Sequence, residues 1–157
     1  MPRAHSYAAL PRVVALDRVS DPGNLGTILR SAEAAGADLV VLTPGGVDPY
    51  NSKVVRASAG ALFYLPVVVA ELDELRTAGL RLIGTSSHDA DGRSVVPHTA
   101  IDFTGRVAIV MGNEAAGLPD EWDDADGPID EWVTIPHRGR SESLNVAMAT
   151  TVLVFEA

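Results

Sequence analysis

Residues 107–111 read VAIVM, and GNEAAGLP follows at 112–119; this stretch does most to decide the fold. Five apolar residues in a row, without polar alternation, are typical of a strand that is buried on both faces, as strands of parallel sheets are. Gly112 ends the apolar run. The stretch therefore predicts an interior strand of a parallel α/β sheet, with a polar loop at its carboxyl end.

Short apolar runs of the same kind recur along the chain and alternate with helical segments. The predicted strands are 12–16 (RVVAL), 39–42 (LVVL), 65–69, 81–85 (RLIGT), 95–96 and 132–135. The predicted helices are 25–35, with Asn24 as N-cap and Gly36 after its end, 52–62, 71–78 and 143–156. This alternation predicts an α/β fold with a mostly parallel sheet and helices on both faces. We assign it to one domain at 12–157, preceded by a short N-terminal extension at 1–11.

The composition excludes several classes of protein. The 157 residues include no cysteine, which excludes a disulfide framework, a zinc ribbon, an iron–sulfur cluster and a thiol nucleophile. No metal site is predicted. No apolar run approaches the roughly 18 residues of a membrane span, and residues 1–11 (MPRAHSYAALP) lack the apolar core of a signal peptide. We therefore expect a cytoplasmic protein with no membrane partner.

The formal net charge of −9 is concentrated in one stretch of the chain. Seven acidic residues lie between residues 120 and 131, and removing them leaves −2. Because lysine and arginine hold a phosphate backbone, an evenly spread −9 would argue against a nucleic-acid partner, but this distribution leaves most of the chain near neutral. The acidic stretch could hold RNA off one edge, recruit a basic partner or be a solvated loop.

Three polar loops follow predicted strands, at residues 17–30, 112–119 and 135–145. Ligands of parallel sheets bind beyond the carboxyl ends of the strands, so these loops are the candidate site. None of them contains GxGxxG, the P-loop GxxxxGK[ST] or GxSxG. A dinucleotide dehydrogenase, a P-loop NTPase and a hydrolase with a nucleophile elbow are therefore disfavoured.

Several polar residues of these loops allow both a functional and a structural interpretation. Arg30 could bind a phosphate or orient a hydroxyl, with open space left beside it by Gly26 one turn earlier, or it could be an ordinary exposed helical arginine. Glu114 could grip a ligand or cap the backbone that follows it. Ser143 could cap the last helix, which would leave the position of Asn145 in the first helical turn unexplained.

Together and in this order, the three loops resemble the three motifs of the SpoU (TrmH-like) family of the SPOUT superfamily, the RNA ribose 2′-O-methyltransferases. The first motif is NLGTILR at 24–30, and the second is VMGNE at 110–114 with Gly117 and Leu118. The third is Ile135-Pro136 with Gly139, followed by ESLNV at 142–146. The resemblance extends from residue 17 to residue 156, nearly the whole chain.

The resemblance implies methyl transfer from S-adenosyl-L-methionine to a ribose 2′-hydroxyl of rRNA or tRNA. It also implies a C-terminal trefoil knot and a homodimer in which both chains build each active site. The catalytic residues that it implies are Arg30, Asn24, Glu114, Ser143 and Asn145. The cofactor-binding residues that it implies are Met111, Gly112, Asn113, Gly117, Ile135, Pro136, Ser143, Leu144 and Asn145.

Two features depart from the family pattern. Members usually carry an N-terminal domain that recognises RNA, whereas residues 1–11 alone precede the first predicted strand here. We therefore expect RNA recognition to need a missing N-terminal domain or a partner protein. The acidic stretch, beside the cofactor loops, is the second departure. The alternative function is a non-catalytic knotted dimer that acts as a cofactor- or RNA-binding module. The presence of all five implied catalytic residues argues against it: Asn24, Arg30, Glu114, Ser143 and Asn145.

Overall fold

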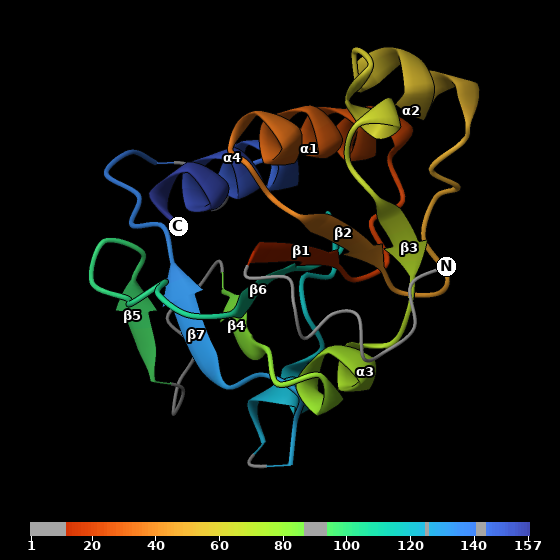
Figure 1. The fold of residues 1–157 in the computed structure, drawn as a ribbon. Coiled ribbons are helices and arrows are strands. Elements are labelled where there is room, and N and C mark those ends of the chain that lie inside the picture. Colours follow the sequence, from red (N-terminus) through yellow and green to blue (C-terminus); the bar gives the residue numbers. More distant parts are fainter. Residues whose placement is uncertain (1–11, 87–93, 125, 141–143) are drawn as a thin grey trace.

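The computed structural model describes residues 12–86, 94–124, 126–140 and 144–157, so the predicted extension at 1–11 lies outside the described residues. Thirteen elements follow one another along the described chain (Figure 1). They are β1 (Arg12–Leu16), α1 (Pro22–Ala34), β2 (Leu39–Leu42), α2 (Ser52–Ala57), the 3₁₀ helix η2 (Ala61–Phe63), β3 (Val67–Val69), α3 (Leu72–Thr77), β4 (Arg81–Thr85), β5 (Val95–Pro97), β6 (Val107–Met111), the 3₁₀ helix η3 (Asp120–Asp123), β7 (Glu131–Thr134) and α4 (Val146–Glu156).

The strands of the described chain form one sheet in the order β3-β2-β1-β6-β4-β7-β5, and every neighbouring pair is parallel. This confirms the predicted parallel sheet. The strand β6 lies at its centre, between β1 and β4, with Met111 paired to Leu16 and Val110 paired to Gly84. The loops that follow β1, β4 and β6 therefore leave the sheet side by side at its carboxyl edge.

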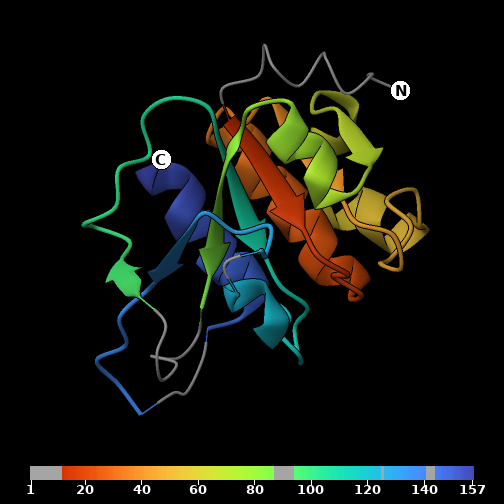
Figure 2. The ribbon, with the colours of Figure 1, turned by 90° about the horizontal axis from the view of Figure 1, so that it is seen from below.

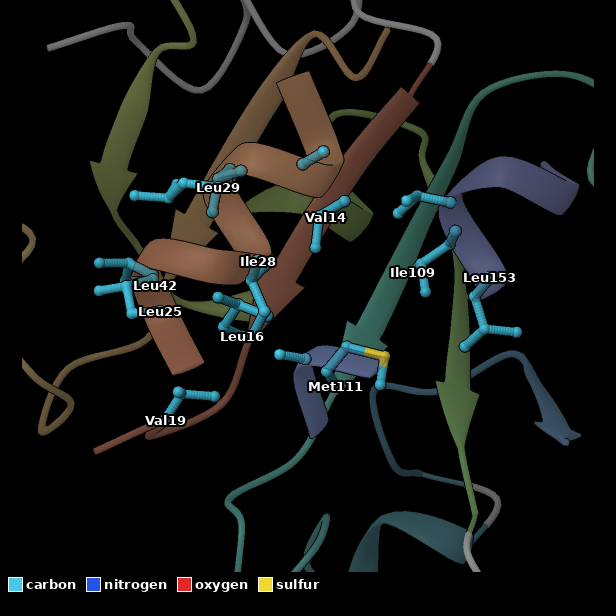
Figure 3. Packing of buried hydrophobic residues seen from close by; sticks show 14 of the residues in the cluster. Val14, Leu16, Val19, Leu25, Ile28, Leu29, Leu42, Ile109, Met111 and Leu153 are labelled. Carbon is cyan, nitrogen blue, oxygen red and sulfur yellow. The ribbon is translucent and has the colours of Figure 1, made fainter. Parts of the chain in front are cut away.

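Helices cover both faces of the sheet, as the alternation of strands and helices predicts. In Figure 1, α1, α2 and α4 lie on one face and α3 on the other; seen from the α3 side in Figure 2, β1 lies in front of α1. On the first face, Ile28 and Leu29 of α1 and Leu153 of α4 pack into the larger buried cluster (Figure 3). On the second face, Leu72 and Leu75 of α3 pack into a separate buried cluster. No helix within the described ranges is long and apolar enough to cross a membrane.

The starts of α1 and α4 differ from the prediction. The N-cap of α1 is Asp21, whose Oδ1 accepts a hydrogen bond from the backbone N–H of Asn24 at 2.9 Å. Asn24 as N-cap was therefore wrong, because Asp21 precedes Pro22, and proline is favoured in the first helical turn. The helix α4 begins at Val146 rather than at residue 143, and Asn145 is its N-cap in place of Ser143, which lies outside the described residues.

The predicted helix at 52–62 was wrong in its second half. It is divided into α2 and η2 because Ala59 and Gly60 take positive φ angles of 51° and 91°, which an α-helix does not accommodate. The other differences are small: α1 begins three residues earlier and ends one residue earlier than predicted, and β5 is one residue longer. The strand β3 begins two residues later, β7 is displaced by one residue, and α3 is one residue shorter at each end. The strands at 12–16, 39–42, 81–85 and 107–111 have the predicted bounds.

Candidate active site

A cavity of about 280 Å³ lies at the carboxyl edge of the sheet, beyond β6. The second and third loops that the sequence singled out form most of its wall. Of the predicted cofactor residues, Met111, Gly112, Asn113, Gly117, Ile135 and Leu144 line it. Pro136 and Asn145 are not among the residues that line it, and Ser143 lies outside the described residues.

The second loop is closed by its own backbone and by one side chain. Asn113 Oδ1 accepts hydrogen bonds from the backbone N–H groups of Ala115 and Ala116 at 2.9 and 3.0 Å, and the N–H of Gly117 donates to the Asn113 carbonyl at 2.9 Å. A Cβ on Gly112 would lie 2.4 Å from both the Gly117 carbonyl carbon and the Leu118 nitrogen. Glycine is therefore required at position 112 for the loop to close this tightly.

Glu114 ties the second loop to the loop that follows β1. Its carboxylate accepts hydrogen bonds from the backbone N–H of Asp21 at 2.9 Å and from the backbone N–H of Ser20 at 3.1 and 3.2 Å. The Ser20 hydroxyl donates a further bond at 3.2 Å, and the Asn113 side chain donates to the Arg18 carbonyl at 2.9 Å. The structure thus fixes the first two loops against each other.

These hydrogen bonds also set the ionisation of Glu114. Partial burial acts to raise the pKa of its carboxyl, but the hydrogen bonds from the Asp21 and Ser20 backbones and the Asn24 side chain outweigh burial and hold the pKa below its ordinary value. The carboxylate is therefore charged at neutral pH. A charged carboxylate only accepts hydrogen bonds, so Glu114 orients any donor that reaches it.

The third loop joins the same cluster through Asn145. The Asn145 side-chain nitrogen donates to Asn24 Oδ1 at 3.0 Å, while Asn145 Oδ1 caps α4 by accepting from the N–H groups of Ala147 and Met148. The structure thereby brings three of the predicted catalytic residues together: Asn24, Glu114 and Asn145.

Arg30 lies apart from this cluster. It is exposed on α1, six residues after Asn24 and so about 9 Å farther along the helix axis. Among the residues that the structure describes, it has no hydrogen-bond or ion-pair partner. The predicted open space at Gly26 was wrong, because a Cβ there would lie 2.4 Å from the Ala57 Cβ. Gly26 instead allows α1 to pack directly against α2.

The comparisons with known proteins agree with this geometry. Residues 11–155 match the SpoU rRNA Methylase family. The chain belongs to this family. It is 38% identical over 156 residues to the 23S rRNA (guanosine(2553)-2′-O)-methyltransferase RlmP of Bacillus subtilis, covering 94% of this chain and 58% of that protein.

Solved structures of SpoU proteins share the fold. An AdoMet-bound rRNA methyltransferase from Sinorhizobium meliloti superposes with a TM-score of 0.84 at 38% identity, covering 99% of this chain and 59% of that one. The SpoU methyltransferase AviRb from Streptomyces viridochromogenes, in complex with AdoMet, has a TM-score of 0.79 at 35% identity, covering 94% of this chain and 59% of that one. The chain thus spans less than two thirds of these relatives.

Some residues of the SpoU cavity were not predicted. Thr85 and Ser86 line it from the end of β4, and the Thr85 hydroxyl donates to the Val110 carbonyl at 3.1 Å. The rule that ligands bind beyond strand ends would have indicated them once β4 was placed beside β6. Ala149 and Leu153 line the cavity from α4, and no local signal distinguishes them from ordinary core residues.

Proposed function

We propose that this SpoU chain transfers a methyl group from S-adenosyl-L-methionine to a ribose 2′-hydroxyl of rRNA or tRNA. The observation that carries the proposal is the cluster of Asn24, Glu114 and Asn145 beside a cavity lined by the second and third motifs. The similarity to a protein named as a 23S rRNA 2′-O-methyltransferase, and to an rRNA methyltransferase with AdoMet bound, supports it.

The residues that line the cavity suit S-adenosyl-L-methionine. Met111, Ile135 and Leu144 offer an apolar wall for the adenine, and the loop at 112–117 offers backbone groups. Apart from residues 116–118 themselves, no atom of the described residues lies within 4 Å of the point where a Cβ on Gly117 would stand, so the absent side chain leaves room beside the loop. When bound, the cofactor supplies an activated methyl group.

The remaining chemistry is alignment and removal of a proton. The ribose hydroxyl must be held in line with the methyl group, at a near-attack distance of roughly 3–3.5 Å. We assign this orientation to Asn24, Glu114 and Asn145, with Ser143 as a further hydroxyl for orienting the ribose or relaying the proton. A guanidinium keeps its proton in proteins, so a neutral Arg30 acting as base would be costly. Arg30 is better suited to positioning the RNA and stabilising the developing alkoxide.

A homodimer is part of the proposal. Residues Leu144, Met148, Val152 and Phe155 recur every three or four positions and are 40%, 64%, 38% and 60% exposed. The last three form an apolar stripe along α4, with Leu144 just before the helix, and a second copy of this chain would cover this stripe. Since Arg30 is exposed on α1, which packs beside α4, the same contact would bring Arg30 toward the cluster of the other subunit.

The trefoil knot and the handling of RNA complete the proposal. The sheet order supports the knot, because β6 enters between β1 and β4 and β7 enters between β4 and β5, all of them earlier in the chain. For the domain at 12–157, we propose that an N-terminal domain or a partner protein selects the RNA.

Two measurements test the function. Calorimetry with S-adenosylhomocysteine should show binding, and a methyl-transfer assay on total rRNA and tRNA should yield one modified ribose that can be mapped. Cofactor binding without transfer to either RNA would favour the alternative, a non-catalytic dimer that binds cofactor or RNA. Absence of cofactor binding would overturn the assignment of the cavity.

A further inference from the structure

Three aromatic side chains within one short segment are exposed to solvent. Tyr50, Phe63 and Tyr64 are 70%, 77% and 80% exposed, although aromatic residues usually bury most of their surface. Tyr50 precedes α2, Phe63 is the last residue of η2, and Tyr64 follows it. These two short helices lie beside α1 (Figure 1). With Lys53 and Arg56 of α2, we name these five residues the 50–64 surface.

The charge of this segment is opposite to that of the whole chain. Lys53 and Arg56 are exposed, lie three positions apart on α2 and so share one side of it. Neither has a hydrogen-bond or ion-pair partner among the described residues. Between residues 43 and 70 the sequence has one acid, Asp48, whose carboxylate accepts from the backbone N–H of Tyr50 at 2.9 Å. A chain with a net charge of −9 thus carries a local cationic and aromatic surface.

The segment is attached to the scaffold of the candidate active site. The loop before Tyr50 is bound to the loop after β1, where the N–H of Val47 donates to the Val19 carbonyl at 3.0 Å. The next residue, Ser20, is bound by Glu114. On the other side of α2, Ala57 packs against Gly26, one turn before Arg30 on α1. The 50–64 surface is therefore held beside the helix that carries Arg30.

We propose that the 50–64 surface binds the single-stranded RNA that flanks the methylated nucleotide; this rests on the proposed function. Bases stack on Tyr50, Phe63 and Tyr64, because every base offers a flat face whatever its sequence. Lys53 and Arg56 contact the phosphates between them.

RNA fits this surface better than a second copy of the chain does. A protein interface would bury two unpaired cations, which is costly unless the partner supplies carboxylates. The stripe on α4 carries no basic side chain and suits a second copy, whereas aromatic rings interspersed with lysine and arginine suit a polyanion that carries bases.

The test measures binding of a fluorescein-labelled single-stranded RNA of about 12 nucleotides, by anisotropy at about 50 mM salt, where phosphate contacts are strong. The triple variant Tyr50→Ala, Phe63→Ala, Tyr64→Ala should weaken binding at least about tenfold. The pair Lys53→Gln, Arg56→Gln should lower the slope of log K against log salt by about 1.4, since each single-strand phosphate contact contributes about 0.7. Val96→Ser on β5 and Arg12→Gln on β1, exposed positions elsewhere, are the matched controls and should bind as wild type.

The outcomes separate this proposal from the proposed function. Wild-type RNA affinity in both the aromatic and the charge variants would overturn the 50–64 surface, whatever the methyl-transfer assay shows. If the aromatic variant lost RNA binding because it became a monomer in analytical ultracentrifugation, the surface would be a contact between subunits and the proposal would be overturned. Weaker RNA binding, with an unchanged oligomeric state and unchanged S-adenosylhomocysteine affinity, is the result we expect.

Discussion

Glu114 links two loops that lie almost a hundred positions apart in the sequence. Its carboxylate accepts bonds from Ser20 and Asp21, and its pKa lies below the ordinary value of 4.5. Because the folded-state pKa is lowered, this residue's contribution to stability is complete above the ordinary pKa and is lost as the pH falls through the folded value. We expect the melting temperature of wild type to exceed that of Glu114→Gln near neutral pH, and the difference to shrink in acid. A difference that stayed constant down to about pH 3 would contradict this linkage.

Arg30 leads to a prediction about activity rather than stability. It has no partner in the part of its own chain that the structure describes and does not line the cavity. Arg30→Ala should therefore leave S-adenosylhomocysteine affinity within a few fold and abolish methyl transfer, since loss of one preorganised charge donor costs about 10²–10³ in rate. Full activity of this variant in the methyl-transfer assay would refute the assigned role. Arg12→Gln, at the opposite edge of the sheet, is the control and should keep full activity.

The sequence allowed some of these residues to be chosen but not their contacts. The motifs selected Asn24, Glu114 and Asn145, which the fold then brought together. The predicted N-cap of α1 was wrong because Asp21 and Asn24, three positions apart, are both good caps, and the prediction did not weigh Pro22, which favours Asp21. The partners of Glu114 depend on how two separate loops meet, which no local pattern contains.

Among the helices and strands, the contact between α1 and α2 is set by one glycine. A Cβ at Gly26 would overlap Ala57 and would approach the backbone nitrogen of Ser58 within 2.9 Å. Gly26→Ala should therefore cost about 1–3 kcal/mol, despite the better helix propensity of alanine. Urea unfolding measures the loss as a lower midpoint. Thr27→Ala, on the exposed side of the same helix, is the control and should be neutral or stabilising.

The strands were predicted better than the helices for a physical reason. The runs at 12–16, 39–42, 81–85 and 107–111 are almost wholly buried, and most of their bounds are set by charged or turn-forming neighbours. The helix at 52–62 was predicted too long because its small residues continue the helical pattern past Ala59. The positive φ of that alanine is a conformation that a residue with a Cβ rarely adopts, so its own preference gives no sign of it.

For the whole molecule, the order of the strands in the sheet could not be predicted from the sequence pattern. Alternating strands and helices predict a parallel sheet, but they do not place β6 beside β1 or α4 beside α1. That order brings Asn24 to Asn145 across 121 positions of sequence. The site therefore depends on the topology. From the sequence, only the family resemblance, which extends over nearly the whole chain, predicted that the three loops form one site.

The proposed dimer makes a prediction that no single chain can satisfy. Suppose that each active site combines Arg30 of one subunit with Glu114 and Asn145 of the other. The single variant Arg30→Ala and the double variant Glu114→Gln with Asn145→Ala should then each be inactive alone. Mixing the two proteins and allowing subunits to exchange should restore activity, because one site of each mixed dimer then has every wild-type residue. Random exchange makes half of the dimers mixed, so activity should reach about a quarter of wild type. Adding Met148→Asp and Phe155→Asp to both proteins should disrupt the α4 stripe and abolish the recovery. No recovery from mixed dimers, with exchange confirmed by mass spectrometry, would show that each chain builds its site alone.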